Sequence, residues 1–413
     1  MQTITPYYGI DLDVLDATLA CAADQAKAVG VTLAMALKGF PLPAAFPTIA
    51  AHVAAVTASG LYEAKLAQGL GRPVHVHAPA YREDEMDELC SLCSHIVFNT
   101  SAQLRRFGPQ ARSRGVSVGL RVNPGFAVSE SPKYDPCRVD SRYGVLPSEL
   151  TDEDLALVDG LHLHALCGAD ADGFAALVER VTAVFGDWLG RLSWLNLGGG
   201  MAIGQDGFVT PRAVAAVMSL KKKGTFEVLI EPCESLTTAC GTLTATVLDV
   251  IRRETDVAIL DVSGACHMPD VINMPYVPTL VAPATASDGW PTVLGGNTCL
   301  SADVIGTYRF AKRLNPGDRV TFAEMGAYTF CQANWFNGVR RPAIVVTSKK
   351  GGPRTVRTWD EKDFVRSVSS VSGTDIPPVI AVKNDFGIIW GQRALTACPL
   401  SSLFDFRVTT ERA

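Results

Sequence analysis

The first 240 residues repeat one hydrophobic pattern. A short apolar, often β-branched run ends at Gly, Pro, Asn or Ser, and a segment rich in Ala and Leu with helical spacing follows it. The runs cover residues 31–39, 53–60, 73–80, 95–101, 116–125, 161–168, 192–200 and 226–232. Eight strand and helix units in roughly 230 residues are typical of a (β/α)8 barrel. The pattern therefore predicts a TIM barrel over residues 11–240.

The pattern changes in the second half of the chain. Strand-like segments come closer together, are rich in Val, Thr and Tyr, and are separated by turns such as "NPGDR" at 315–319. This spacing predicts a separate antiparallel β domain over residues 241–413, to which residues 1–10 are expected to add a strand. Residues 372–413 contain two further short runs about a turn at Asn384–Asp385, and their role is left open. The predicted fold class is α/β.

Residues that end the apolar runs are expected to meet at one place. The C-terminal ends of barrel strands surround a common mouth, where barrel enzymes carry their chemistry. Lys38, Arg121, His164, the run Gly198–Gly200 and Glu231 all occupy such positions. Each of these residues alone is also common on a surface or in a loop. Their convergence at one mouth predicts an active site.

This set of side chains suits one cofactor. A lysine amine forms a Schiff base with an aldehyde, a run of glycine N–H groups binds phosphate, and a carboxylate holds a pyridine nitrogen protonated. Pyridoxal 5'-phosphate has all three groups. Lys38 is therefore predicted to bind the aldehyde carbon, and Gly198, Gly199 and Gly200 are predicted to bind the phosphate. Glu231 is predicted to bind the ring nitrogen, which allows the ring to accept electrons from the substrate's α-carbon.

Composition bears on whether the chain binds nucleic acid, spans a membrane, forms disulfides or holds a metal. The chain has 413 residues, is 47% hydrophobic and carries a formal charge of −5, which predicts a large core and gives no basic surface for nucleic acid. No apolar run reaches the length of a membrane span, so a cytoplasmic protein is expected. The eleven cysteines are expected to be reduced. Cys90 and Cys93 are expected to pack in a helix, and no metal site is predicted.

Several strings of the sequence carry a specific resemblance. They include "ALKGF" with Lys38, "ASGLYEA", "HVHAPAYREDEMDEL", "LHLHALC", "WLNLGGG", "HMPDV", "GGNTCLSADVIG" and "FNGV", in this order along the chain. With them the chain resembles the alanine-racemase-like (fold-type III) pyridoxal-phosphate decarboxylases, and among these the carboxynorspermidine/carboxyspermidine decarboxylases of polyamine biosynthesis. The similarity runs from about Pro6 to about Ser369.

The resemblance implies roles around the cofactor. Lys38 matches the Schiff-base lysine, and His164 matches the histidine that stacks on the cofactor ring. Arg121 matches an arginine near the ring, and Tyr328 in "GAYT" matches a tyrosine that contacts the phosphate. The glycine run and the glutamate keep the roles given above.

The resemblance also implies a homodimer with shared active sites. Cys299 matches a cysteine that reaches the site of the second subunit and protonates the α-carbon after CO2 leaves. A thiol with a pKa near the working pH suits that task, although a free cysteine is also an ordinary buried residue. Asp303 matches an aspartate that meets the substrate's distal amine.

Departures from the family pattern bear on the substrate. "EPCES" places Cys233 where a glycine is usual, and a side chain there is expected to weaken phosphate binding. Met201 follows the glycine run in place of a histidine. Gly168 and Asn273 stand where glutamates are usual, and Val277 where an arginine is. Asn273 is therefore predicted to line the substrate site, and the loss of two carboxylates predicts a substrate less cationic than carboxynorspermidine.

Three functions remain after these observations. The first is PLP-dependent decarboxylation of an α-amino acid that carries a further amine. The second is an amino-acid racemase or epimerase on the same fold, which the "NTC" string with Cys299 and Asp303 disfavours. The third is a non-catalytic, decarboxylase-like binding protein, against which the presence of Lys38, Glu231 and Cys299 argues.

Overall fold

The computed structural model describes residues 4–129, 132–138, 140–283 and 285–369. Among the described residues, 4–364 belong to one compact unit, and residues 365–369 lie beyond its boundary and are considered separately. The barrel and a β sheet both belong to the first unit. The two short runs expected in residues 372–413 lie outside the described residues.

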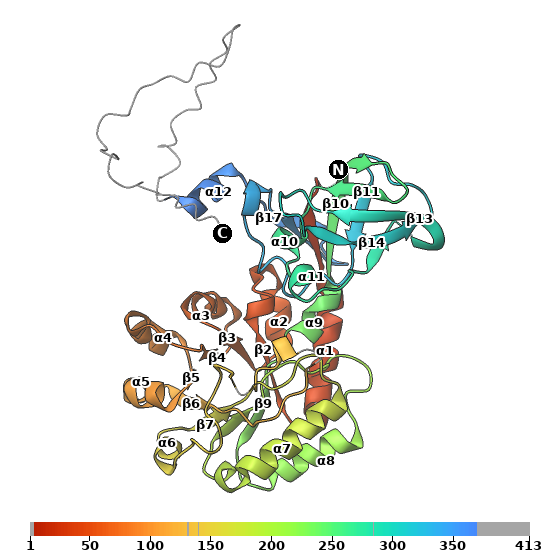
Figure 1. Cartoon of the computed structure of the whole chain (residues 1–413). Coiled ribbons are helices and arrows are strands. Elements are labelled where there is room, and N and C mark those ends of the chain that lie inside the picture. Colours follow the sequence, from red (N-terminus) through yellow and green to blue (C-terminus); the bar gives the residue numbers. More distant parts are fainter. Residues whose placement is uncertain (1–3, 130–131, 139, 284, 370–413) are drawn as a thin grey trace, which may run out of the picture. The chain divides into compact units, whose positions relative to one another are not determined.

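The predicted barrel is confirmed. Eight parallel strands close on themselves, each paired with the next and the last with the first (Figure 1). They are β2 (Thr32–Ala36), β3 (Ala55–Ala58), β4 (Val74–His77), β5 (His95–Phe98), β6 (Ser117–Arg121), β7 (Gly160–His162), β8 (Trp194–Asn196) and β9 (Glu227–Ile230). Each strand lies within one of the eight apolar runs or begins one residue before it.

Helices follow the barrel strands, and side-chain caps fix where several of them begin. The helices are α1 (Leu12–Val29), α2 (Phe46–His52), α3 (Leu61–Ala67), α4 (Met86–Leu92), α5 (Ser101–Ser113), α6 (Asp152–Ala156), α7 (Ala171–Leu189), α8 (Pro211–Lys221) and α9 (Glu234–Thr237). Asp11, Thr100, Asp170 and Thr210 each accept a hydrogen bond from a backbone N–H in the first turn of α1, α5, α7 and α8. None of the described helices is long and apolar enough to span a bilayer.

The second substructure is a nine-stranded sheet among the described residues. Its strands are β1 (Tyr7–Asp11), β10 (Gly241–Ile251), β11 (Asp256–Leu260), β12 (Leu280–Ala282), β13 (Thr285–Gly295), β14 (Val304–Phe310), β15 (Arg319–Phe322), β16 (Ala343–Thr347) and β17 (Arg354–Arg357). Two short helices accompany it, α10 (Gly264–His267) and α11 (Asp270–Asn273), and α12 (Glu361–Val368) follows β17 in the sequence.

The sheet differs from the expected antiparallel domain because it is mixed. β1 pairs with β16 in parallel, and β11 pairs with β13 in parallel, while the other pairs are antiparallel. A parallel pair needs a long connection. The whole barrel lies in the sequence between β1 and β16, and α10, α11 and β12 lie between β11 and β13.

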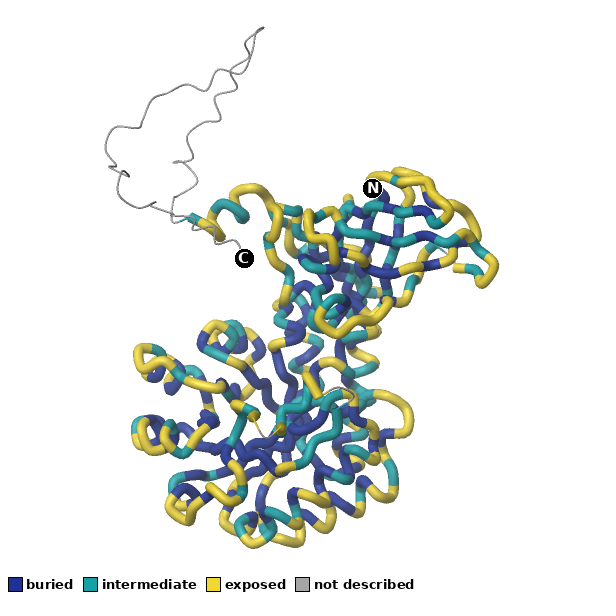
Figure 2. The backbone as a smooth tube through the Cα atoms, in the orientation of Figure 1, coloured by how far each residue is buried: buried dark blue, intermediate teal, exposed yellow. Residues whose placement is uncertain are grey.

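A tryptophan and two histidines pack together in the barrel interior beneath its mouth. Trp194 fills the lower part, where a Cβ added to Gly119 or Gly160 would lie 2.3 or 2.0 Å from its indole. The imidazoles of His75 and His95 lie beside it, with their centroids 3.8 Å apart. Figure 2 shows that buried residues follow the barrel strands, while exposed residues gather on the surrounding helices and loops. The candidate site lies between these aromatic residues and the mouth of the barrel.

Candidate active site

One pocket at the strand ends collects four of the predicted residues. Lys38, Arg121, His164 and Glu231 line it together. Its other lining residues are Ala36, Thr57, Ala58, Ser59, His77 and His162. The convergence that the sequence predicts is therefore present in the structure for these four side chains.

Lys38 lies two residues beyond the end of β2. It is exposed, whereas its neighbours Leu37 and Gly39 are buried, so the backbone is held while the ammonium group faces the pocket. Strand β2 thus ends on an amine that a cofactor in the pocket can reach.

Glu231 follows β9 directly, and both of its carboxylate oxygens accept hydrogen bonds. His162 Nε2 lies 3.1 Å from Oε1, and Asn196 Nδ2 lies 2.9 Å from Oε2. Burial alone would raise the pKa of Glu231, but its interactions with His162, which include a hydrogen bond, and with Lys38 and His164 outweigh burial and lower the pKa to about 2. Glu231 is therefore a carboxylate in the neutral pH range, as an acceptor for a ring N–H must be.

The two histidines of "LHLH" have different partners. His164 Nδ1 accepts a hydrogen bond from the Gly199 N–H at 3.1 Å, which leaves its proton on Nε2. Burial lowers the pKa of His164 well below its usual value, and the charges of Lys38 and Arg121 add to the effect. Burial also lowers the pKa of His162. Both rings are therefore neutral, and a neutral imidazole can lie against an aromatic ring.

Arg121 ends β6 and is buried. Its guanidinium carbon lies 4.2 Å from the centre of the Tyr143 ring, and Nη1 lies 3.5 Å from His77 Nδ1. Burial lowers its pKa to about 10, against the attraction of Glu231 and Tyr143. The side chain therefore remains a cation held flat between an aromatic ring and the pocket.

Close packing against neighbouring carbonyl oxygens requires glycine at residues 198, 199 and 200. A Cβ would lie 2.4 Å from Leu163 O at Gly198, 2.6 Å from Glu231 O at Gly199 and 1.9 Å from Leu166 O at Gly200. Gly198 N–H donates to Asn196 Oδ1 and Gly199 N–H to His164 Nδ1, so these two donors already have partners within the chain. Gly200 is the member of the run whose N–H we expect at the phosphate. Phosphate binding by the other two stays a prediction.

We expect Gly200→Ala to be much more destabilising than Gly207→Ala. Both glycines have φ of +84°, which costs an alanine about 1–2 kcal/mol. A Cβ at Gly207 meets nothing within 4 Å, whereas at Gly200 it overlaps Leu166 O, which adds about 1–3 kcal/mol. Urea denaturation of the two variants measures the difference. Equal losses of unfolding free energy would show that the close approach at Gly200 is not as described.

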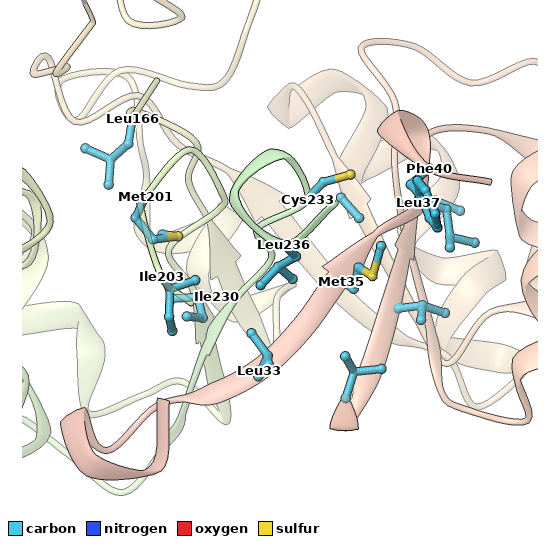
Figure 3. Packing of buried hydrophobic residues seen from close by; sticks show 14 of the residues in the cluster. Leu33, Met35, Leu37, Phe40, Leu166, Met201, Ile203, Ile230, Cys233 and Leu236 are labelled. Carbon is cyan, nitrogen blue, oxygen red and sulfur yellow. The ribbon is translucent and has the colours of Figure 1, made fainter. Parts of the chain in front are cut away.

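Tyr328 and Cys233 lie against the residue after Lys38. Tyr328 N donates to Gly39 O at 3.1 Å, and a Cβ on Gly39 would lie 2.7 Å from Cys233 Sγ and 3.2 Å from Tyr328 Cζ. Cys233 belongs to the same hydrophobic cluster as Leu37 and Phe40 (Figure 3). Burial raises the pKa of its thiol to about 11. The Cys233 side chain thus packs on Gly39, and its predicted effect on phosphate binding stays a prediction.

The predicted residues of the sheet domain, Cys299, Asp303 and Asn273, do not line the Lys38 pocket, and the glycine run and Tyr328 are not among its lining residues either. Cys299 is exposed in the loop after β13, and its N–H donates to Asn337 Oδ1 at 2.9 Å. Asp303 is buried; its Oδ1 accepts from Gly264 N at 2.8 Å, and its Oδ2 from Thr298 Oγ1 at 2.6 Å. The substrate role of Asp303 stays a prediction, although both carboxylate oxygens have partners inside the sheet domain.

Asn273 ends α11 and is exposed. Its backbone carbonyl accepts hydrogen bonds from Lys133 Nζ at 2.8 Å and from Tyr134 OH at 3.0 Å. The loop after β6 therefore reaches α11 of the sheet domain. The predicted contact of Asn273 with the substrate is not tested by these bonds.

Sequence reasoning missed two residues of the site. Asn196 and His162 bind Glu231, but neither was assigned a role from the pattern. Asn196 ends β8 directly before the glycine run and His162 ends β7, so both occupied the strand-end position that indicated the other candidates. Strand-end position was the available signal for both.

Comparison with known proteins decides the family. The family model described as "Pyridoxal-dependent decarboxylase, C-terminal sheet domain" matches residues 16–326. The chain belongs to the pyridoxal-dependent decarboxylases. This confirms the resemblance found in the sequence, and pyridoxal phosphate is the cofactor of the family.

The most informative relatives of this decarboxylase are full-length matches. It is 34% identical over 373 residues to a carboxynorspermidine/carboxyspermidine decarboxylase of Campylobacter jejuni, a match that covers 87% of this chain and 97% of the relative. It is 33% identical to a carboxyaminopropylagmatine decarboxylase of Synechocystis, covering 87% of this chain and 94% of the relative. The crystal structure of the C. jejuni carboxynorspermidine decarboxylase complexed with norspermidine superposes with a TM-score of 0.80 at 33% identity, covering 88% of this chain and 100% of that one.

Proposed function

We propose that this decarboxylase removes the α-carboxylate of an amino acid that carries a further amine: carboxynorspermidine, carboxyspermidine or a less cationic analogue. The observation that carries the proposal is the single pocket that joins the Lys38 amine, the anionic Glu231 and the neutral His164. The relatives named above are decarboxylases of substrates of this kind, which supports a place in polyamine biosynthesis.

The residues of the pocket fit pyridoxal phosphate. Lys38 offers an exposed amine, Glu231 a carboxylate, and Gly198–Gly200 a cradle that any Cβ would fill. Lys38 would hold the aldehyde carbon, Glu231 the ring nitrogen, and Gly200 with Tyr328 the phosphate. When bound, the cofactor supplies a ring that accepts the electron pair left behind by CO2.

The side chains around the ring have separate tasks in this proposal. Glu231 keeps the ring nitrogen protonated because its own pKa of about 2 leaves it a carboxylate at working pH. His164 presents the flat face of a neutral imidazole to the ring. Arg121 supplies a fixed positive charge at the side of the pocket, held by Tyr143.

A second copy of the chain completes the site in this proposal. Cys299 is exposed and lies outside the Lys38 pocket, so its thiol is available to a neighbouring subunit. Exposed apolar side chains occur close to it in the sequence and beyond, at Leu300, Val304 and Phe336. A homodimer would cover such residues and bring Cys299 of one subunit to the α-carbon held by the other, where the thiol donates the proton.

Two carboxylates of the chain would suit a cationic substrate. Burial, together with the charges of Asp270, Glu234 and Glu324, raises the pKa of Tyr276 to about 12. Burial raises the pKa of Tyr328 as well, with Glu234 and Asp270 again among the contributing charges. Asp270 and Glu234 thus contribute negative charge at both tyrosines, and in this proposal that charge would take the place of the glutamates lost at Gly168 and Asn273.

We expect Asp270→Asn to raise the KM for a carboxy-polyamine about 10- to 100-fold, with a smaller effect on kcat. Burial raises the pKa of Asp270, so the ionised form gains from a bound ammonium group, and one charged hydrogen bond is worth about 1.5–3 kcal/mol. The matched control is Asp288→Asn, an exposed aspartate of β13. Steady-state kinetics of the two variants decide the matter, and equal KM values would remove Asp270 from the substrate site.

A substrate panel tests the proposed function. The PLP-loaded enzyme is assayed for CO2 release with carboxynorspermidine, carboxyspermidine, carboxyaminopropylagmatine, ornithine, lysine and diaminopimelate. We expect the highest kcat/KM with one of the first three. A preference for ornithine, lysine or diaminopimelate would overturn a carboxy-polyamine as the substrate while leaving the decarboxylase family intact.

A further inference from the structure

A single buried amide connects the two parts of the cofactor pocket. Asn196, the last residue of β8, is 2% exposed. Its Nδ2 donates to Glu231 Oε2 at 2.9 Å, and its Oδ1 accepts from Gly198 N–H at 2.8 Å. One side chain therefore binds both the carboxylate predicted for the ring nitrogen and the first residue of the glycine run.

The hydrogen bonds permit only one orientation of this amide. A backbone N–H can only donate, so the atom that faces Gly198 must be the oxygen, and the NH2 group must face Glu231. Glu231 Oε2 is thus an acceptor and carries no proton. His162 Nε2 likewise donates a hydrogen bond to Glu231 Oε1.

The backbone reinforces this connection. Glu231 N donates to Gly198 O at 2.8 Å, and a Cβ at Gly199 would lie 2.6 Å from Glu231 O. The backbone of β9 and the glycine run are therefore already in contact. These backbone contacts do not determine the direction of the Glu231 side chain. The hydrogen bonds from Asn196 and His162 determine it.

We propose that Asn196 is a positioning residue, which keeps Glu231 ionised and holds it at a set distance from the glycine run. That distance would match the separation between the ring nitrogen and the phosphate of the cofactor. The inference rests on the proposed role of Glu231. Asn196 acts through Glu231 and Gly198 and need not touch the cofactor itself.

The charge balance around Glu231 makes the proposal testable by pH. The groups that face Glu231 are His162 and His164 of β7 and the segment after it, His75 of β4, Arg121 of β6 and Lys38 beyond β2. None of these groups is an anion, and their interactions with Glu231 outweigh the burial that would favour a proton on its carboxylate. The wild-type cofactor site is therefore expected to bind PLP without a transition caused by Glu231.

Asn196→Asp replaces the donor with a second carboxylate. The oxygen that faces Gly198 is kept, while the other comes within hydrogen-bond distance of Glu231 Oε2. Two carboxylates at this distance share one proton, and the upper apparent pKa of such a pair is strongly raised. The dissociation constant of PLP and the visible spectrum of the loaded protein are then expected to change with pH between roughly pH 5 and 8. The wild-type protein should lack this additional transition.

The control is Asn99→Asp. Asn99 is also a buried residue at a barrel strand end, and its amide joins two backbone groups, Gly144 N–H and Arg142 O, in place of a carboxylate. Its substitution introduces the same carboxylate into the same barrel. We expect PLP binding by this variant to follow the wild-type pH profile.

A double variant guards against a simple folding defect. Glu231→Gln combined with Asn196→Asp exchanges donor and acceptor across the same contact. We expect the double variant to unfold at a higher temperature than Asn196→Asp alone and to lose the pH dependence of PLP binding. No recovery of either property would show that the contact between Asn196 and Glu231 is not what the single substitution disturbs.

The outcomes separate this inference from the proposed function. A wild-type protein that binds PLP tightly at Lys38, together with an Asn196→Asp variant whose PLP dissociation constant matches wild type at every pH, would overturn the inference alone. A wild-type protein that binds PLP elsewhere than at Lys38 would overturn the proposed site and the inference with it. A pH transition in Asn196→Asp that is absent from wild type and from Asn99→Asp supports the inference.

Discussion

Replacing Lys38 by alanine is expected to abolish covalent binding of pyridoxal phosphate and to lower kcat by at least about 10³-fold. Lys38 is the amine in the pocket that also contains Glu231 and His164. Without it the cofactor has no covalent anchor, and the step in which an amine is exchanged for the substrate's amine is lost. The visible absorbance of the loaded protein, and the mass of the protein after borohydride reduction, measure the attachment directly.

Lys65→Ala provides the matched control for this prediction. Lys65 is a lysine of α3 whose ammonium group pairs with Glu88 at 2.8 Å on the barrel surface. Its loss should leave both the absorbance and the reduced adduct unchanged. A borohydride-stable adduct that persists in Lys38→Ala would show that another lysine holds the cofactor.

Replacing Cys299 by alanine is expected to lower the rate of correct product formation by about 10²–10³-fold. CO2 release should continue, because the thiol acts only afterwards, when the α-carbon needs a proton. Without that donor, a larger share of turnovers is expected to protonate at the wrong carbon, which yields an aldehyde and converts the cofactor to pyridoxamine phosphate. Product analysis by mass spectrometry distinguishes the two fates.

Two controls sharpen the Cys299 experiment. Cys21→Ala removes a thiol of α1 and should leave the product ratio unchanged. Mixing inactive Lys38→Ala with Cys299→Ala subunits should restore activity, because one of the two sites in a mixed dimer then has both residues intact. If Cys299→Ala gave the wild-type product ratio, the thiol would not be the proton donor; if mixing gave no recovery, Cys299 would act within its own subunit.

The barrel was predictable because its signal is local. Each strand is a short apolar run closed by a turn residue, and the alternation with helical spacing is readable within a window of about 15 residues. Lys38, Arg121 and Glu231 followed from the barrel alone, since strand ends of a closed parallel barrel must share one mouth.

The remaining features depend on partners that are remote in sequence. The mixed sheet was missed because β1 pairs with β16 across more than 300 residues, and alternation does not reveal the direction of a partner strand. The roles of His162 and Asn196 arise from hydrogen bonds between strands, which a pattern of apolar positions does not encode. The packing of Cys233 on Gly39 was missed for the same reason, because a motif gives the position of a side chain but not its direction.

The most direct test of the central claim is mass spectrometry of the product formed in D2O from carboxynorspermidine by the PLP-loaded enzyme. The account predicts loss of one CO2 and gain of one deuterium at the former α-carbon, to give the corresponding amine. A substrate that keeps its carboxylate and only exchanges the α-hydrogen for deuterium would show a racemase or epimerase. That result, or the absence of any mass change with PLP bound at Lys38, would contradict the assignment of this chain as a carboxy-polyamine decarboxylase.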